Sequence, residues 1–269
     1  MLGFLRRWMS GISRASAGCI APIRDDDVRD LNQEFSDNQH RKYAYSFDYH
    51  MHDYMLRTFD PFLPKGRALE LGCYEGAFTE RLAALYDDLT VVEGASELIA
   101  KAQSRIGKRA NFILDQFERF KPRGRFEAIF LLHTLEHIDE PVPLLQRIGS
   151  WLSPDGRLFL AVPNAYAASR QIAVAMGLIA SPTAVTQGEH LHGHRRTYCL
   201  ETFKGDITAA GLNIVESGGI LFKPLANFQF DTLLEKQIIL KDFLDGCYLL
   251  GKHYPELCAS IYAICEADH

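Results

Sequence analysis

Between residues 66 and 163, short apolar segments alternate with amphipathic segments, and this alternation limits the possible folds more than any other feature. The apolar segments have the length and residue types of strands, whereas the others repeat their apolar residues with a helical period. Strands that alternate with helices predict right-handed β-α-β units and a parallel sheet. The expected strands are 67–71, 89–93, 111–115, 125–132 and 153–163, and the expected helices between them are 78–86, 96–106 and 141–152.

The pattern is less regular on both sides of this region. Polar residues open an expected helix near 25–40, and helical spacing then continues to Pro61. We therefore divide the chain into an N-terminal helical cap, 1–60, and a main domain, 61–269, with an insert near 165–198. The elements expected after Pro163 are helices at 165–180, 199–211 and 231–246, strands at 212–222 and 258–267, and a polar, histidine-rich loop at 181–198.

Composition narrows the classes of function. The 269 residues are 47% hydrophobic, which is enough for one large domain with a cap. A formal net charge of -5 gives no strong basic field, so no nucleic-acid partner is expected. The six cysteines form no C-x-x-C pair, which favours reduced thiols and a cytoplasmic location. The first twenty residues lack a continuous apolar stretch, and no segment approaches the ~20 apolar residues of a membrane span.

The stretch LELGCYEGAF, residues 69–78, joins the first strand to the first helix. Gly72 and Gly76 allow a sharp turn and the close approach of a ligand to a helix N-terminus. A dinucleotide fingerprint G-x-G-x-x-G would need a third glycine, but Tyr74 and Glu75 occupy this turn. Glu70 precedes the first glycine and is unsuited to a phosphate. The turn therefore favours a cationic or amine-bearing ligand.

This stretch resembles motif I of class I S-adenosylmethionine-dependent methyltransferases, whose pattern is acid-x-Gly-x-Gly-x-Gly. Glu70, Gly72 and Gly76 match, whereas Tyr74 stands where the middle glycine usually lies. Because a bulky residue at positive φ is costly, we predict a negative φ for Tyr74, with its ring turned toward the ligand or the cap.

The resemblance implies a Rossmann-like α/β fold, with a seven-stranded, mostly parallel sheet, an antiparallel last strand and helices on both faces. It implies S-adenosylmethionine as the cofactor, with Glu93 on the ribose hydroxyls, Asp115 near the adenine amino group and a tyrosine of the cap on the methionine carboxylate. His133 would meet the cofactor through its backbone carbonyl. The full set of expected cofactor residues is Tyr45, Glu70, Gly72, Cys73, Tyr74, Gly76, Glu93, Gly94, Asp115, Gln116, Phe117 and His133.

The segment FLLHTLEHIDEPVPLL resembles the family's fourth-strand region, in the H-x-x-E-H form common in its small-molecule members. If the segment is helical, His133 and His137 share one face. One of them would then contact the substrate or take its proton, since imidazole titrates near neutral pH. The alternative is structural, with Glu136 and His137 capping the next helix.

A second group of histidines lies in the insert, in the stretch GEHLHGHRRTY. In an extended segment, His190, His192 and His194 would share a face, and Glu189 could complete a metal site. No further acidic cluster with ligand spacing is evident, so we predict no metal. We expect the loop to cover the substrate pocket, with His190 or His192 as a base, or else to be solvated.

Two arginines follow these histidines. Arg195 or Arg196 would suit a carboxylate or phosphate of the substrate.

These features together predict a methyltransferase that acts on a small-molecule acceptor, by O- or N-methylation of a sugar or a specialised metabolite. The acceptor would attack the sulfonium methyl group in line, while the protein aligns the reactants. Two alternatives belong to other classes: a cofactor-binding regulator without catalysis, and an NAD-dependent oxidoreductase, which the missing third glycine and Glu70 disfavour. The sequence leaves a homodimer open.

Overall fold

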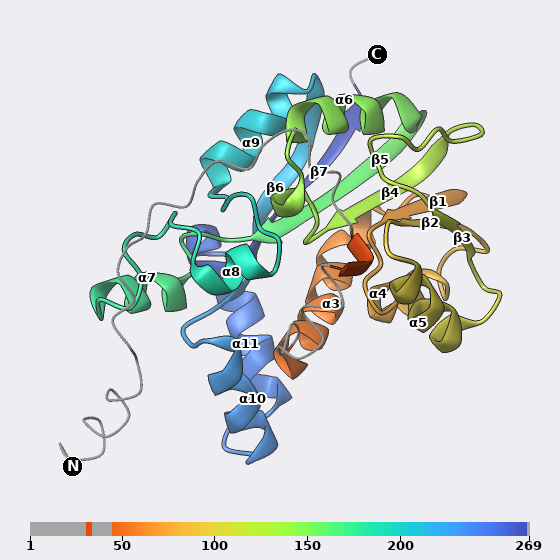
Figure 1. Ribbon diagram of the computed structural model, residues 1–269. Helices are drawn as coiled ribbons and strands as arrows, with labels where there is room; N and C mark the ends of the chain where they lie inside the picture. Colours follow the sequence, from red (N-terminus) through yellow and green to blue (C-terminus); the bar gives the residue numbers. More distant parts are fainter. Residues whose placement is uncertain (1–30, 34–44, 268–269) are drawn as a thin grey trace, which may run out of the picture. The chain divides into compact units, whose positions relative to one another are not determined.

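The computed structural model describes residues 31–33 and 45–267, and these form a seven-stranded sheet covered by helices on both faces (Figure 1). The strand order is β3-β2-β1-β4-β5-β7-β6, and β7 alone runs antiparallel to its neighbours. This confirms the predicted fold class. Most of the helix expected near 25–40 lies outside the described residues. The strands are β1 Arg67–Leu71, β2 Asp88–Glu93, β3 Asn111–Leu114, β4 Phe126–Leu132, β5 Leu152–Pro163, β6 Leu212–Phe222 and β7 Cys258–Ala267.

Two hydrophobic cores lie on opposite faces of the sheet. Because side chains alternate along a strand, Leu69 and Leu71 pack in one core, while Ala68 packs in the other. The α-helices are α3 Ser46–Phe59, α4 Ala77–Leu82, α5 Ser96–Ile106, α6 Pro141–Trp151, α7 Ala168–Ala175, α8 Gln187–Leu191, α9 Leu200–Ala209, α10 Asn227–Glu235 and α11 Lys241–Gly251. Short 3₁₀ helices are η2 Asp60–Phe62, η3 Leu135–His137 and η4 Pro255–Leu257.

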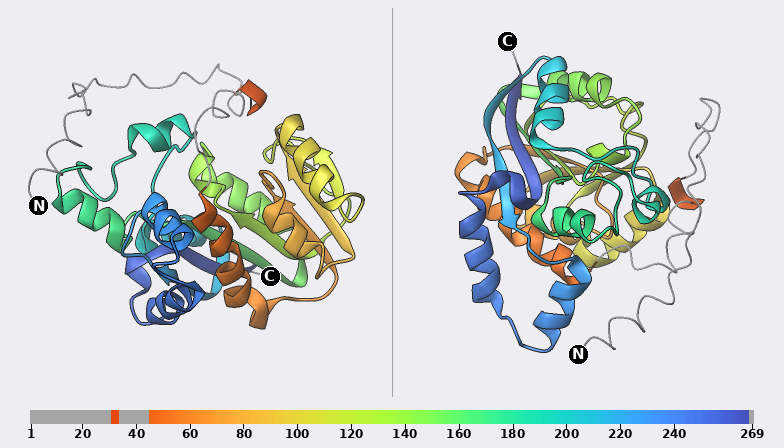
Figure 2. Two further views of the ribbon diagram at one scale, coloured as in Figure 1. Left: turned by 90° about the horizontal axis from the view of Figure 1, so that it is seen from below. Right: turned by 90° about the vertical axis from the view of Figure 1, so that its left-hand side faces the viewer.

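Helices far apart in the chain cover the same face. Helices α6 and α9 lie together on one side of the sheet, whereas α3, α10 and α11 gather on the other (Figures 1 and 2). Phe47 of α3 stacks on Phe230 of α10, with ring centroids 4.4 Å apart. The described part of the predicted cap is thus packed into one of the two cores.

Two expected helices end earlier than their apolar pattern predicted. The helix expected at 231–246 is two helices, α10 and α11, because the chain leaves the helix at Gln237, where φ is +53°. There the Ile238 N–H reaches the Leu233 carbonyl at 2.9 Å, which satisfies a carbonyl that the helix end leaves open. The helix expected at 165–180 ends in the same way at Gly177, whose φ is +72°.

The loop expected at 181–198 contains a short helix, α8. Its first turn is closed by Thr186, whose hydroxyl accepts the Glu189 N–H at 3.3 Å, while the Glu189 carboxylate accepts the Thr186 N–H at 2.8 Å. This reciprocal capping box supplies the helix start that the sequence pattern did not reveal. No helix among residues 45–267 is long and apolar enough to cross a membrane.

Candidate functional site

The turn after β1 holds three residues at positive φ: Gly72 at +82°, Tyr74 at +47° and Gly76 at +79°. The predicted negative φ for Tyr74 is therefore wrong. Two backbone bonds fix this path, from the Gly72 N–H to the Val92 carbonyl and from the Gly76 N–H to the Cys73 carbonyl, both 2.9 Å. Left-handed backbone costs a side-chain-bearing residue roughly 1–2 kcal/mol, which the surrounding structure offsets at Tyr74.

The two glycines of the turn cannot be replaced without movement of their neighbours. A Cβ at Gly72 would lie 2.8 Å from the Thr134 hydroxyl oxygen, and a Cβ at Gly76 would lie 2.7 Å from the Ala102 Cβ. The turn is therefore packed against η3 on one side and α5 on the other.

Glu70 lies in β1 with 4% of its surface exposed, and one of its carboxylate oxygens has no hydrogen-bond partner among the described residues. Burial raises the pKa of this carboxyl group to about 8. A positive charge nearby would stabilise the ionised form and lower the pKa again. The site therefore has the chemistry to accept an ammonium group, as the sequence predicted for its ligand.

Glu93 ends β2 and joins the second strand to the turn. One carboxylate oxygen accepts the Cys73 N–H at 3.1 Å and the other accepts the Ala95 N–H at 3.0 Å. Burial raises the pKa of Glu93, although these two bonds favour the ionised form. The Cys73 thiol also donates to the first of these oxygens, at 3.9 Å. The second oxygen therefore keeps a lone pair with which to accept a ligand hydroxyl.

The ends of β2 and β3 meet beside Glu93. The Asp115 N–H reaches the Glu93 carbonyl at 3.2 Å, and the Asp115 carboxylate accepts the Gln116 N–H at 2.9 Å. A Cβ at Gly94 would lie 3.8 Å from the Asp115 carbonyl, and one at Gly72 would lie 3.6 Å from the Phe117 ring. The structure thus brings the predicted cofactor residues of three strands to one edge of the sheet.

Tyr45 is the residue immediately before α3. Its N–H donates to the Asp48 carboxylate at 2.8 Å, and its side chain is partly buried against the core that includes α3. Its predicted contact with the methionine carboxylate stays a prediction.

His133 follows β4 and has a φ of +49°, so it does not continue into the short helix η3. The condition for a common helical face with His137 is therefore not met, because the left-handed residue changes the direction of the chain before η3 begins. The His133 Nε2 lies 2.8 Å from the Ser260 hydroxyl of β7. Burial lowers the pKa of His133 to about 3, which makes this imidazole a weak base.

Glu136 and His137 meet a histidine of the insert. The rings of His137 and His194 lie edge to face with centroids 4.6 Å apart, and the His137 Nε2 is 4.0 Å from a Glu136 carboxylate oxygen. Only 2% of Glu136 is exposed, and burial raises its pKa to about 8. Burial lowers the pKa of His194 to about 4. We call these three residues the Glu136 cluster.

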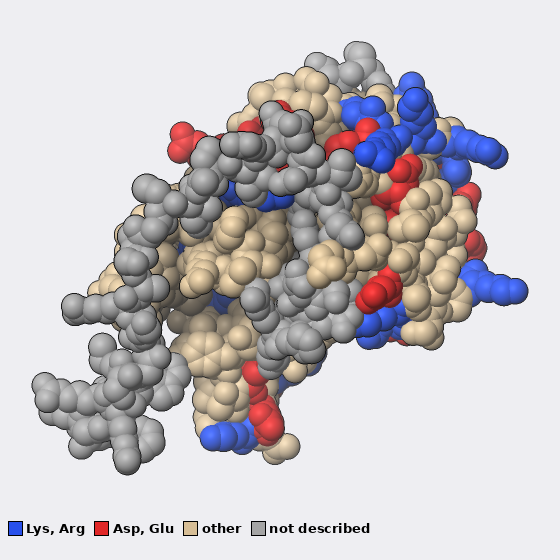
Figure 3. All heavy atoms as spheres, in the orientation of Figure 1, with Lys and Arg blue, Asp and Glu red and all other residues tan. Residues whose placement is uncertain are grey.

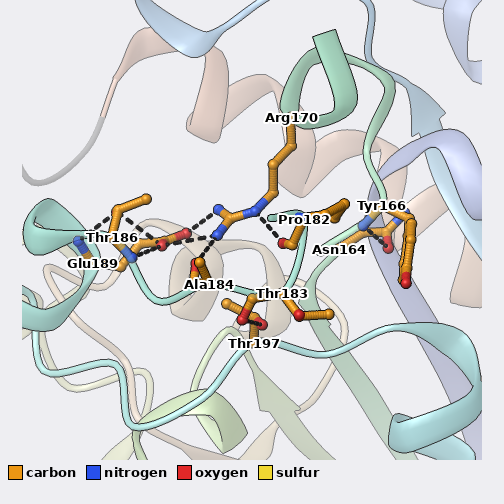
Figure 4. A network of polar contacts seen from close by, with 9 residues as sticks. All are labelled: Asn164, Tyr166, Arg170, Pro182, Thr183, Ala184, Thr186, Glu189 and Thr197. Carbon is orange, nitrogen blue, oxygen red and sulfur yellow. Dashed lines mark hydrogen bonds and ion pairs between the residues drawn. The ribbon is translucent and has the colours of Figure 1, made fainter. Parts of the chain in front are cut away.

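Arg170 of α7 forms hydrogen bonds with several residues of the insert (Figure 4). The Arg170 guanidinium donates to the Glu189 carboxylate and to the Pro182 and Ala184 carbonyls. The Glu189 carboxylate therefore pairs with Arg170. The extended segment assumed for His190, His192 and His194 is wrong, because the capping box winds residues 187–191 into α8.

Arg195 and Arg196 fasten the insert to the end of β4. Arg195 Nε lies 3.0 Å from an Asp139 carboxylate oxygen, and the Arg195 N–H donates to the Glu136 carbonyl at 2.9 Å. Arg196 donates to the Ile138 and Asp139 carbonyls at 3.2 and 2.7 Å. Both arginines thus have structural partners, in place of the substrate anion for which the sequence proposed them.

Two polar residues beside these elements carried no sequence signal. His52 of α3 packs edge to face against Phe78, with ring centroids 5.4 Å apart, and burial lowers its pKa to about 4. Lys223 follows β6, its ammonium lies 5.6 Å from the Phe47 ring centre, and burial lowers its pKa. Both positions belong to patterns that are ordinary for a helix or a strand end, so the sequence did not single them out.

Comparison with known proteins identifies the protein family to which this chain belongs. Residues 38–217, more than half of the chain, match a family described as a methyltransferase domain. The chain therefore belongs to this methyltransferase family, and its cofactor is S-adenosylmethionine. The predicted class, enzyme activity and cofactor are confirmed.

Individual relatives are distant. A ubiquinone biosynthesis O-methyltransferase from Xanthomonas axonopodis pv. citri is 26% identical over 167 residues, which cover 60% of this chain and 68% of the relative. Nodulation protein S from Sinorhizobium fredii is 29% identical over 120 residues, or 43% of this chain and 56% of the relative.

A solved structure shares the fold at low identity. The N-methyltransferase NodS from Bradyrhizobium japonicum, in complex with S-adenosyl-L-homocysteine, aligns with a TM-score of 0.56 and 17% identity. The alignment covers 88% of this chain and all of the other.

Proposed function

We propose that this methyltransferase transfers the methyl group to a hydroxyl oxygen of a small-molecule acceptor. The observation that carries the proposal is the Glu136 cluster just after β4. A hydroxyl must lose its proton when it attacks the methyl group, whereas a neutral amine needs little beyond orientation. A buried carboxyl group next to two imidazoles suits the first task and is not needed for the second. The O-methyltransferase named among the relatives supports this choice.

The cofactor would lie along the carboxyl ends of β1, β2 and β3. In this proposal Glu70 faces the amino group, Glu93 accepts the ribose hydroxyls and Asp115 lies near the adenine amino group. Gly72, Cys73, Tyr74 and Gly76 line the amino-acid end through their backbone. The remaining proposed contacts are the His133 carbonyl, Gly94, Gln116, Phe117 and the Tyr45 hydroxyl.

The acceptor would lie between the end of β4 and the insert. Arg195 and Arg196 hold the insert against this edge, which supports the proposed role of residues 165–198 as a cover. Residues 1–60 would form a cap in the same proposal. A covered pocket favours a small molecule and excludes water from the reacting atoms. Among the four histidines first considered as the base, His137 is favoured over His133, His190 and His192 because it adjoins Glu136.

The environment of the thiols supports a cytoplasmic location as part of this proposal. The described cysteines are all free, and all but Cys199 are buried. Free thiols are typical of reducing compartments.

Paired acceptors test the proposal. Small phenols and alcohols would be compared with the matching amines, with transfer of the labelled methyl group followed by mass spectrometry. We expect methylation of hydroxyls, and we expect His137→Ala to lower turnover by ~100-fold or more while S-adenosylmethionine affinity changes little. Transfer to amines alone, or an equal loss of turnover and affinity in His137→Ala, would contradict the proposal.

A further inference from the structure

The Glu136 cluster brings three side chains with metal-ligand chemistry together. One ligand atom from each of Glu136, His137 and His194 lies within 4.8 Å of the other two. Two histidines and a glutamate are the ligand set of several catalytic zinc sites, in which a fourth position stays open. A tetrahedral ion with bonds of about 2.0–2.1 Å holds its ligand atoms about 3.4 Å apart. The ligand atoms would therefore have to approach one another by at most about 1.4 Å to surround an ion.

Glu136 supplies a second observation that points to a ligand. Its second carboxylate oxygen is fully enclosed and has no hydrogen-bond partner among the described residues. A buried polar atom without a partner costs about 1–3 kcal/mol, and more if the group is charged. A bound divalent ion would remove this cost and would favour the ionised carboxylate. A metal ion bound to this oxygen would therefore stabilise the buried carboxylate.

The cations around the cluster are already paired with other groups. Arg170 binds Glu189, Arg195 faces Asp139, and Arg196 donates to backbone carbonyls. None of these guanidinium groups forms an ion pair with Glu136 within the described part of the chain. A cavity of about 20 Å³, lined in part by Glu136 and His194, adjoins the cluster. This volume has room for about one water-sized group.

From this geometry we propose that Glu136, His137 and His194 bind one divalent transition-metal ion, with Zn²⁺ as the ion that best fits the ligand set. The ion would link the insert to the end of β4, since His194 and His137 come from these two segments. This inference rests on the proposed function and deepens it, because such an ion lowers the pKa of a bound acceptor hydroxyl. His137 would then act as a ligand and not as a free base.

The test measures metal binding directly on the full-length chain. The protein is freed of metal with a chelator, the chelator is removed, and ZnCl₂ is titrated by calorimetry. CoCl₂ serves as a spectroscopic probe, since nitrogen ligands to Co²⁺ give absorption in the visible range. We expect one equivalent to bind, and we expect His194→Ala and Glu136→Gln to weaken binding by ~100-fold or more.

Two further variants control for adventitious binding. His253→Ala alters an exposed histidine beyond α11 and should leave affinity unchanged. His190→Ala probes the neighbouring histidines of the insert and should also have little effect. Absence of binding, or a loss in His190→Ala with none in His194→Ala, would overturn the inference. Circular dichroism would confirm that each variant is folded.

Different experimental outcomes would refute the metal site and the proposed function. A protein that binds S-adenosylmethionine and methylates hydroxyls without metal would refute only the metal site. A protein that binds one Zn²⁺ at the cluster but methylates only amines would refute only the proposed function.

Discussion

The buried carboxyl group of Glu70 makes the binding of S-adenosylmethionine a proton-linked event. With a pKa of about 8, the group is about nine-tenths protonated at pH 7 in the unbound protein. An ammonium group placed beside a carboxylate lowers its pKa by about 1–3 units. A shift of about two units, to about 6, would release about 0.8 of a proton per cofactor bound at pH 7.

Calorimetry in buffers with different ionisation enthalpies measures this proton. The slope of observed binding enthalpy against buffer ionisation enthalpy gives the number of protons exchanged. The amino group of the ligand is itself mostly protonated at pH 7, so the fraction of a proton that it takes up is small beside the change at Glu70. We therefore compare the natural protein with Glu70→Gln, which keeps the size of the side chain and cannot titrate. A difference of about 0.8 proton is expected from the shift worked out above.

The dependence of proton release on pH distinguishes titration of Glu70 from a purely structural role of this acid. Release should shrink at pH 9, where Glu70 is already ionised before the ligand arrives. Equal proton counts in the natural protein and in Glu70→Gln at pH 7 would refute the placement of the cofactor ammonium near this carboxylate.

Three further predictions concern the turn, the ribose contact and the buried acids. Glu93→Ala should weaken the binding of S-adenosylmethionine by ~10-fold or more, because charge-assisted hydrogen bonds are lost. An unchanged affinity in calorimetry would rule out the contact of Glu93 with the ribose. Gly76→Ala should reduce the free energy of unfolding in urea by more than Gly211→Ala does; both residues have positive φ, but only Gly76 lacks space for a Cβ. Burial raises the pKa of Glu136 to about 8, so its contribution to stability is present below pH 4.5 and lost as pH rises through 8. The melting temperature of the metal-free protein should accordingly fall less over pH 5–8.5 in Glu136→Gln than in the natural protein, and parallel curves would contradict this.

The local patterns of the sequence predicted the central strands and the place of the turn after β1. Short apolar segments between segments of helical period identified these strands, because strands buried on both faces are nearly continuous apolar runs. The resemblance to the methyltransferase family placed Glu70, Glu93 and Asp115 at one binding edge, and parallel strands do end on the same side of a sheet. The prediction of the strands needs only residues that are close in the chain.

Tertiary contacts decided the rest. The left-handed backbone of Tyr74 follows from the hydrogen bonds that enclose the turn, and no side-chain pattern encodes them. His194 meets His137 only because Arg195 and Arg196 hold the insert against the end of β4. Helix period and strand alternation describe which face of a segment is buried, but they do not record which distant segment covers it. The cluster of Glu136, His137 and His194 therefore exists only in the folded chain.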